Sequence, residues 1–407
     1  MTNLKKLFTA VLIAASAVAL IPNALAQSVH PKGVTILDPA QVDWGLVFFT
    51  PPDGIPKLIG LDGTLVREWG QPSDQIQWAR PNFDLSGDIL ALTGAVPVLD
   101  YPFPLPDKMA QFDADGNLFF EWNDFPLSKG TFAAVHHDMI RLPNGNTMVL
   151  CATVITVPTI SPNPLLDECI LEMDWNGDIV WEWYAHEHFD QFGFTDEAKQ
   201  LISDAAGDWA HSNSLSIIPD NNHTDPAFTP GNVMVSFREL NTIVIIDRAS
   251  EDIVWKVGPH ADRLTIGQHD AQMIPLGRPG AGNIIAFDNG LRAGYPPISR
   301  PFSQVIEIDP TTKQVVWRYN ATFSGFPQWD FFSAIISGAT RLENGNTMIT
   351  EGTKGRLIQV TQTGEIVWEF MSPYFEANPG PGGVDVKNYA IFRGFPTPLW
   401  WGLPLDP

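Results

Sequence analysis

The sequence LEMDWNGDIVWEW (171–183) is one copy of a motif that recurs six times along the chain. Each copy has an apolar run, then Asp or Thr, a turn, a few β-forming residues and a Trp. Where the turn is Asn-Gly or Asp-Gly, such a pattern is typical of a β-hairpin. The other copies are LIGLDGTLVREW (58–69), AQFDADGNLFFEW (110–122), VIIDRASEDIVW (244–255), IEIDPTTKQVVW (306–317) and IQVTQTGEIVW (358–368).

A second hairpin motif lies between these copies. HDMIRLPNGNTMVL (137–150) and SGATRLENGNTMIT (337–350) match almost position for position, and three more divergent copies occupy corresponding places. Each unit therefore contains four short strands, and six units predict an all-β fold, a six-bladed β-propeller with a central channel. A short helix near residues 196–206 is the one exception that we expect. The Trp that ends each unit is expected to pack between neighbouring blades.

The two ends of the chain differ from these repeats. Residues 1–26 have a charged start, an apolar stretch and Ala24-Leu25-Ala26, which is typical of a signal peptide that is cleaved on secretion. We therefore expect a periplasmic or secreted protein, with the propeller at residues 27–370. GLVFFT (45–50) is expected to add strands that close the ring. The Pro-rich residues 371–407 are expected to form a C-terminal tail that packs across a face of the propeller.

Composition limits the possible partners. The chain has 407 residues, 44% hydrophobic and 17% charged, as in folded globular proteins. Its 24 Lys and Arg residues against 46 Asp and Glu give a net charge of -22. This charge repels nucleic acid and anionic lipid, so neither is an expected partner. We expect no membrane insertion after signal cleavage, because the apolar stretch is too short to span a bilayer.

The chain has two cysteines, Cys151 and Cys169, each at the end of a strand-like run. Because the expected compartment is oxidising, a cross-strand disulfide is favoured over two free buried thiols. Two thiols do not make a zinc site by themselves.

Polar residues share one position at the start of the inner strands. The residues that stand six positions before the Pro or Glu opening the turn are His137, Asn213, His269 and Ser337. His211 lies two residues before Asn213 and on the same strand face, whereas His136 is expected to point to the opposite face. Three histidines from three consecutive blades should therefore converge at one mouth of the channel, which predicts a functional site.

Arg238 lies within the apolar strand pair VMVSFRELNTIVIID (233–247). A buried guanidinium needs a carboxylate or an anion as its partner. Glu239 is expected to point to the opposite face, so a bound oxyanion and a structural ion pair are equal alternatives for Arg238. Arginine forks match tetrahedral anions. The mouth has no clustered carboxylates for glycoside hydrolysis, and a three-histidine metal site is conceivable.

The segments HHDMIRLPNGNT, DWAHSNS, SFRELN, GQHDAQMIP, FDNG and EGTKGRLIQVT occur in this order. In them the chain resembles the bacterial periplasmic aryl-sulfate sulfotransferases, from about Val34 to Met371. The resemblance implies a six-bladed propeller that moves a sulfuryl group from a small aryl sulfate donor to a phenolic acceptor. It implies no nucleotide sulfate donor, no cofactor and no metal.

The resemblance also implies roles for the residues at the mouth. His269 would be the nucleophile that carries the sulfuryl group as a sulfohistidine. The side chains that would hold the sulfate oxygens are His211, Arg238, His137 and Asn213. Ser333 or Ser337 would supply a hydroxyl where the family has a Thr.

Other interpretations of the mouth stay open. A non-catalytic secreted propeller would use it to bind a small anion or a protein partner, and a metal-dependent hydrolase ranks last. The aromatic residues that precede channel strands would line a phenol-binding mouth or anchor loops; they are Trp78, Trp209, Trp329, Phe331 and Phe332.

Overall fold

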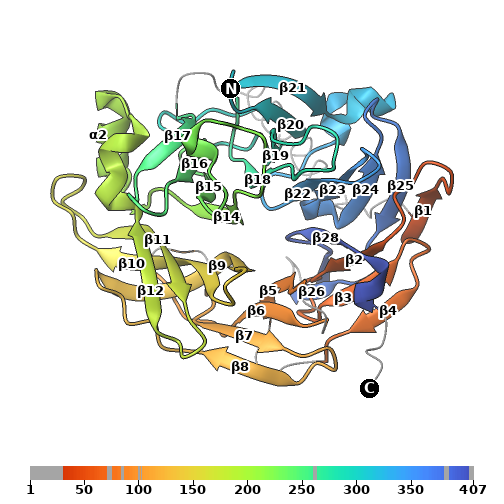
Figure 1. Ribbon diagram of the computed structural model, residues 1–407, viewed down its shortest axis with the longest axis horizontal. Helices are drawn as coiled ribbons and strands as arrows, with labels where there is room; N and C mark the ends of the chain where they lie inside the picture. The colour runs from red at the N-terminus through yellow and green to blue at the C-terminus, as the bar shows by residue number, and fades with distance from the viewer. Residues whose placement is uncertain are drawn as a thin grey trace, which may run out of the picture. The chain divides into compact units, whose positions relative to one another are not determined.

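The computed structural model describes residues 31–70, 76–83, 87–99, 101, 103–259, 264–379 and 385–402. From Gly33 onward the chain forms a ring of antiparallel sheets (Figure 1). Across these described ranges, six sheets of four or five strands surround the central channel, which confirms the predicted all-β, six-bladed propeller. The predicted signal peptide lies outside the described residues.

In each blade one strand lies beside the channel and the others follow outward to the rim; the strands are given in that order. The first blade contains β28 (Gly394–Thr397), β2 (Leu46–Phe49), β3 (Lys57–Gly60) and β4 (Leu65–Glu68). The second contains β5 (Ile76–Pro81), β6 (Ile89–Thr93), β7 (Lys108–Phe112) and β8 (Leu118–Trp122). The third contains β9 (Thr131–Arg141), β10 (Thr147–Ile155), β11 (Leu165–Met173) and β12 (Ile179–Tyr184).

The remaining three blades follow the same plan. The fourth contains β14 (Ser212–Ile217), β15 (Val233–Phe237), β16 (Thr242–Ile246) and β17 (Ile253–Val257). The fifth contains β18 (His269–Met273), β19 (Ile284–Asp288), β20 (Gln304–Asp309) and β21 (Gln314–Tyr319). The sixth contains β22 (Gly338–Arg341), β23 (Thr347–Glu351), β24 (Arg356–Val360), β25 (Ile366–Met371) and β1 (Gly33–Leu37).

Smaller elements connect the blades. Helix α2 (Asp196–Ala205) lies where a helix was expected, and the Thr195 hydroxyl caps it by accepting the Ala198 N–H. Strand β13 (Gly207–Asp208) pairs in parallel with β11, and β26 (Glu376–Pro379) pairs with β27 (Asp385–Asn388). The 3₁₀ turns are η1 (Ala185–Phe192), η2 (Pro226–Phe228), η3 (Ala321–Ser324), η4 (Gln328–Asp330), η5 (Gly352–Lys354) and η7 (Leu399–Gly402).

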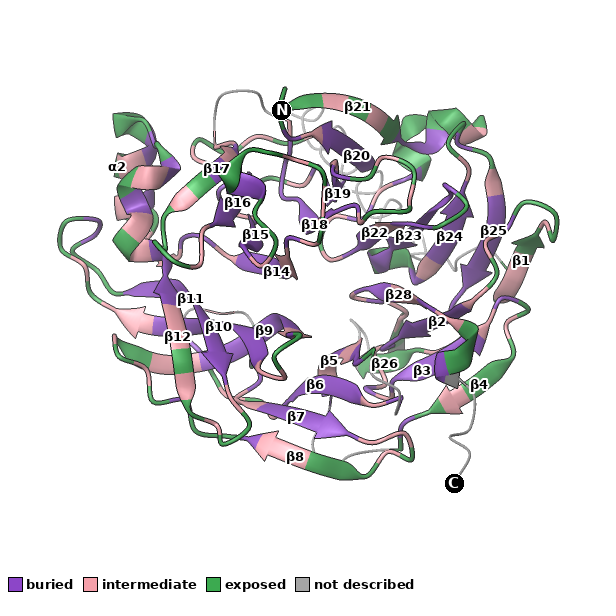
Figure 2. Cartoon of the chain, viewed as in Figure 1, coloured by how far each residue is buried: buried purple, intermediate pink, exposed green. Residues whose placement is uncertain are grey.

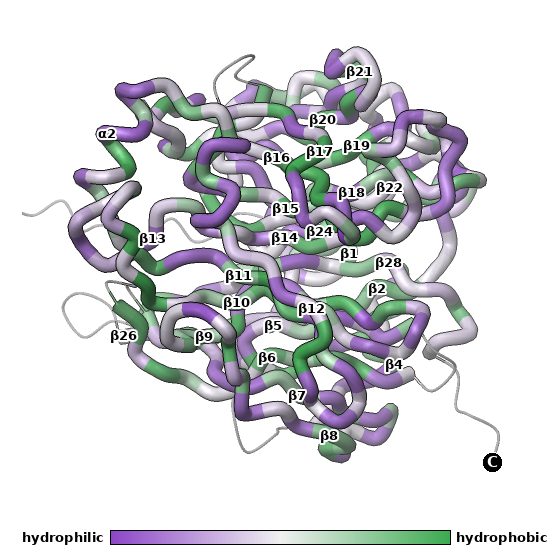
Figure 3. Tube along the Cα trace, turned by 60° about the vertical axis from the view of Figure 1, so that its left-hand side comes forward, coloured by the Kyte–Doolittle hydropathy of each residue, from purple (hydrophilic) through white to green (hydrophobic). Residues whose placement is uncertain are grey.

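Burial decreases from the inner strands to the rim. All residues of β2 and β6 are buried, whereas most residues of β8 and β21 at the rim are exposed or half-buried (Figure 2). Hydrophobic residues are spread over all the blades and not gathered in one segment (Figure 3). They form several clusters, most of which join neighbouring blades. The ring is therefore held together by blade-to-blade packing, as a repeat architecture requires.

The repeated Trp explains the hairpin motif. The indole N–H of Trp255 donates to the Pro310 carbonyl at 2.8 Å, and Trp317 donates to the Gln362 carbonyl at 2.8 Å. Trp368 of the sixth blade donates to the Leu61 carbonyl of the first blade at 2.7 Å. Each acceptor lies at the rim hairpin of the following blade. In these three copies the Trp therefore packs against the next blade and also satisfies its polar N–H there.

The ring closes differently from the sequence-based division at residue 370. Strand β28 is not a tail on a face of the propeller: it pairs with β2 and forms the innermost strand of the first blade. The physical reason is that one strand alone, β2, precedes the β3–β4 hairpin in that blade, so its inner edge needs another partner. At the other end, β1 pairs with β25 at the rim of the sixth blade.

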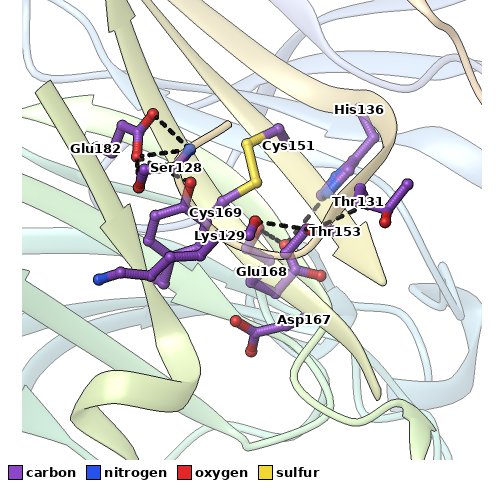
Figure 4. Close-up of a disulfide and its surroundings, with 12 residues drawn as sticks. Ser128, Lys129, Thr131, His136, Cys151, Thr153, Asp167, Glu168, Cys169 and Glu182 are labelled. Atoms are coloured by element: carbon purple, nitrogen blue, oxygen red, sulfur yellow. Dashed lines mark hydrogen bonds and ion pairs between the residues drawn. A yellow bond between two sulfur atoms is a disulfide. The ribbon is translucent and has the colours of Figure 1, made fainter. Parts of the chain in front are cut away.

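A disulfide joins two adjacent strands of the third blade. Cys151 on β10 stands directly opposite Cys169 on β11, and the two sulfur atoms are bonded (Figure 4). Both residues are buried. The cross-link therefore fixes the register of the strands beside the inner strand β9.

We expect the double variant Cys151→Ala/Cys169→Ala to unfold more easily than the wild type. The bond closes a loop of 18 residues, and loops of this size contribute about 3 kcal/mol to the free energy of unfolding. Urea unfolding followed by tryptophan fluorescence measures the difference. The reduced wild type should match the double variant, and an unchanged midpoint in both would contradict this contribution.

Candidate active site

Strained backbone marks one end of four neighbouring inner strands. Positive φ angles occur at His137 (60°), His211 (51°), Asp270 (54°) and Ser337 (89°), none of which is a glycine. Such residues cost about 1–3 kcal/mol each and collect at functional sites. The strain lies at the mouth that the histidine register predicts.

The structure brings the predicted histidines to this mouth. The ring centroids of His137 and His211 are 4.9 Å apart. The Phe392 ring, which precedes β28, lies 5.7 Å from the His137 ring and 6.4 Å from the His269 ring. Trp78 stacks on His137 at 4.9 Å. The C-terminal segment therefore contributes an aromatic wall that the repeats gave no reason to expect.

Hydrogen bonds fix the tautomer of His269. The Asn289 amide nitrogen donates to the carbonyls of Ser333 and Ile336 at 2.8 Å each, so its oxygen faces His269 Nδ1, also at 2.8 Å. The Gly267 carbonyl, which can only accept, lies 3.2 Å from the same nitrogen. Nδ1 therefore carries the proton, and the lone pair on Nε2 accepts the Ile336 N–H at 3.2 Å.

Two of the histidines are held neutral. Burial lowers the pKa of His269 well below its usual 6.5, and the charge of Arg238 lowers it further. Burial likewise lowers the pKa of His137 well below 6.5, with further contributions from His211 and His136. Since a protonated imidazole has no lone pair to share, this environment keeps one lone pair on each of the two rings.

His211 has a carboxylate behind it. Its Nδ1 lies 2.6 Å from Asp208 Oδ2. Burial alone would raise the pKa of Asp208, but His211 and the nearby Arg238 outweigh it and hold that pKa below its usual range. Strand β13 holds Asp208 opposite Leu166 of β11. The carboxylate therefore orients the imidazole.

Two expectations about side-chain direction are wrong. Glu239 does not point away from Arg238: the two form an ion pair, because β15 ends at Phe237 and strand alternation stops there. His136 does not point away from His137: their Nδ1 atoms lie 2.8 Å apart, because the positive φ of His137 breaks the alternation. Arg238 Nε is nevertheless buried and has no hydrogen-bond partner among the described residues.

The predicted amide and hydroxyl groups are engaged within the protein. Asn213 Nδ2 donates to the Gln268 carbonyl at 2.8 Å. Ser337 Oγ donates to Ser333 Oγ at 2.8 Å, and Ser333 Oγ donates to the Ile335 carbonyl at 3.0 Å. All three predicted residues are fully buried. The two serines fix the loop that carries Ile336, and Asn213 fixes the residue before His269.

A buried ion-pair network lies beside the histidines. Arg393 Nη1 donates to Asp138 Oδ2 at 2.7 Å, and Arg393 Nε lies 3.2 Å from Asp270 Oδ1. Arg80 Nη1 donates to the other Asp138 oxygen at 3.1 Å. The sequence signal for this network was the Asp that follows His137 and His269 in each motif. Its partner Arg393 carried no signal, because it lies outside the repeats.

The aromatic residues expected at the mouth lie in different environments. Trp78 contacts His137, as described above. Trp209 and Phe331 are buried in the core, and Trp329 is 70% exposed.

Within the described ranges, no three His, Cys, Asp or Glu side chains are placed to share a metal ion. No helix in those ranges is long and apolar enough to cross a bilayer.

A propeller with neutral histidines and an arginine at its mouth suits the handling of a small oxyanion. The Arylsulfotransferase (ASST) family model matches residues 69–378, which is most of the chain, and the chain belongs to this family. Membership supports aryl sulfotransferase activity in general. No curated protein matches the chain.

Solved structures show likeness in fold alone. A protein of unknown function from Bacteroides caccae is 13% identical, with a TM-score of 0.51 over 87% of this chain and 99% of that one. A streptogramin B lyase is 13% identical, with a TM-score of 0.43 over 89% and 92%. Virginiamycin B lyase from Staphylococcus aureus is 14% identical, with a TM-score of 0.40 over 86% of each chain.

The neutral histidines predict how stability depends on pH. Unfolded histidines take up protons near pH 6.5, whereas folded His137 and His269 do not. Their contribution is therefore complete above that pH and is lost as the pH falls below it. Each should add a slope of about 1.4 kcal/mol per pH unit to the free energy of unfolding.

Urea unfolding between about pH 8 and pH 5 measures this slope, and the His137→Gln variant should show a shallower one. The same slope in the variant and the wild type would show that His137 is not held neutral.

Proposed function

We propose that this protein is an aryl-sulfate sulfotransferase that works through a sulfohistidine at His269. The observation that carries the proposal is the neutral His269, whose tautomer places the lone pair on Nε2. A nucleophile of this kind splits a transfer between two phenols into two steps with a covalent intermediate. Family membership supports the substrate class.

The proposed reaction has two steps. Nε2 of His269 attacks the sulfur of the donor, the N–S bond forms, and the S–O bond breaks to release a phenolate. A phenolic acceptor then gives up its proton, which balances the proton taken up by the first phenolate, and attacks the sulfur. The S–N bond breaks, and its electron pair returns to Nε2. The proton stays on Nδ1 of His269 and donates to the Asn289 amide oxygen throughout, so the positive charge that develops on the ring during attack is stabilised from behind.

Positively charged side chains at the mouth supply the attraction for an anion that the protein as a whole lacks. The net charge of -22 repels an anionic substrate, so local positive charge must attract it. The buried Arg238 Nε has no partner among the described residues and is free to donate to a sulfate oxygen. His211, backed by Asp208, and His137 are placed to donate to others. We assign Asn213, Ser333 and Ser337 to positioning of the loops around His269.

We also propose that the protein acts outside the cytoplasm. The leader-like residues 1–26 support export, and so does the disulfide between Cys151 and Cys169, since such bonds persist in oxidising compartments.

Replacing His269 by Ala should abolish transfer without unfolding the protein. Release of 4-nitrophenolate from 4-nitrophenyl sulfate measures the reaction, with phenol as acceptor and phenyl sulfate as product. Wild-type release should rise with phenol, and mass spectrometry should find sulfated His269. Full activity in His269→Ala would refute the nucleophile. Sulfate binding without release, in folded wild type, would favour a propeller that only binds its anion.

Arg238→Gln should lower kcat/KM by about 10²–10³, because it removes a donor to the charge that develops in the transition state. The matched control is Arg292→Gln, which removes the same charge from an exposed position. Screening by solvent should keep its effect within about twofold. Equal losses in the two variants would show that Arg238 acts through long-range charge and not through contact.

A further inference from the structure

A chain of buried polar groups leads away from His137. His136 Nδ1 lies 2.8 Å from His137 Nδ1, and His136 Nε2 lies 3.2 Å from Glu168 Oε2. The side chains of His136 and Glu168 are only 3% and 4% exposed. Figure 4 shows both beside the disulfide of the third blade. Ser212 donates its hydroxyl to the same carboxylate oxygen. The chain therefore runs from the channel mouth into the blade.

Two facing imidazole nitrogens at this distance share one proton. If the proton belongs to His136, that ring is an imidazolium paired with Glu168, and His137 carries its own proton on Nε2. If it belongs to His137, that ring has its proton on Nδ1 and a lone pair on Nε2. When the shared proton moves to His137 Nδ1 and the Nε2 proton leaves for a substrate oxygen, His137 therefore changes from a donor at the mouth into an acceptor.

We propose that His136 and Glu168 form a proton relay behind His137, which gives a proton to the departing phenolate and takes one from the incoming phenol. The proposal rests on the sulfuryl transfer proposed above. That reaction needs an acid in its first step and a base in its second. His269 cannot be this acid or base, because its Nε2 is bonded to sulfur between the two steps.

The protons balance over the two steps. As the S–O bond of the donor breaks, the phenolate oxygen takes the Nε2 proton of His137. His137 Nδ1 then takes the shared proton from His136, which becomes neutral and keeps its Nε2 proton towards Glu168. In the second step the acceptor phenol gives its proton to His137 Nε2, and the shared proton returns to His136. The enzyme ends in its starting state.

The surroundings favour a stored proton at His136 over one at His137. Burial and the charges of His211 and Arg393 keep His137 neutral. A cavity of about 10 Å³, room for one water molecule, is lined by both histidines and Glu168. The other titratable groups around it are His211, Asp208 and Tyr101. Asp208 is engaged with His211, which leaves Glu168 as the carboxylate in contact with His136.

The test compares two donors in the Glu168→Gln variant of the full chain. An amide does not stabilise the imidazolium, so no proton is stored. With phenyl sulfate, whose phenolate is strongly basic, kcat should fall about 10²-fold, the usual contribution of a general acid. With 4-nitrophenyl sulfate, whose phenolate leaves without a proton, the donor step should change less than about threefold. KM should stay unchanged for both. His136→Asn should give the same pattern.

The matched control is Asp208→Asn, which removes the carboxylate behind His211 instead. Because His211 holds sulfate oxygens in either donor, losing the carboxylate that orients it should lower the rates with both donors equally. If Glu168→Gln and His136→Asn each lowered the rate equally with the two donors, the relay would be overturned and the sulfotransferase would stand. A folded wild type that transfers from neither donor would instead overturn the proposed function.

Nitrogen-15 spectra of the histidine rings give a readout that needs no substrate. In the resting wild type both nitrogens of His136 should be protonated, and His137 should have its proton on Nε2. A neutral His136 with one proton would overturn the relay whatever the activity.

Discussion

One guanidinium connects the strands that carry the histidines. Arg393 reaches Asp138 of the third blade and Asp270 of the fifth, and it donates to the Asn213 carbonyl of the fourth at 3.3 Å. Asp138 and Asp270 directly follow His137 and His269 in sequence, so ion pairing fixes both histidines through the backbone. A buried pair adds little net stability, yet losing one partner costs about 3–5 kcal/mol. The network therefore specifies geometry more than it stabilises the fold.

At the mouth, two neutral histidines lie close to positively charged side chains. His137 and His269 are neutral because they are buried among cations, and the same cations attract an anionic substrate. Burial therefore serves nucleophilicity and binding at once. Backbone strain at His137, His211 and Asp270 is compatible with this arrangement because hydrogen bonds and ion pairs surround each of them.

The repeats predicted the blades and the meeting of three histidines, because both follow from strand periodicity. Periodicity failed where the backbone leaves the strand. The directions of His136 and Glu239 were wrong for that reason: one neighbours a residue with positive φ, and the other lies in a turn. Phe392 and Arg393 were missed because no repeat contains them. Their positions depend on β28 pairing with β2, a contact between segments that are far apart in the sequence.

This pairing of β28 with β2 also sets the order of assembly. Every histidine at the mouth is synthesised before the strand that brings Phe392 and Arg393 into the channel. Synthesis proceeds from the N-terminal end of the chain. A partly made chain therefore has its histidines but not the cation that aligns them. The mouth is completed only after β28 has been synthesised and has paired with β2.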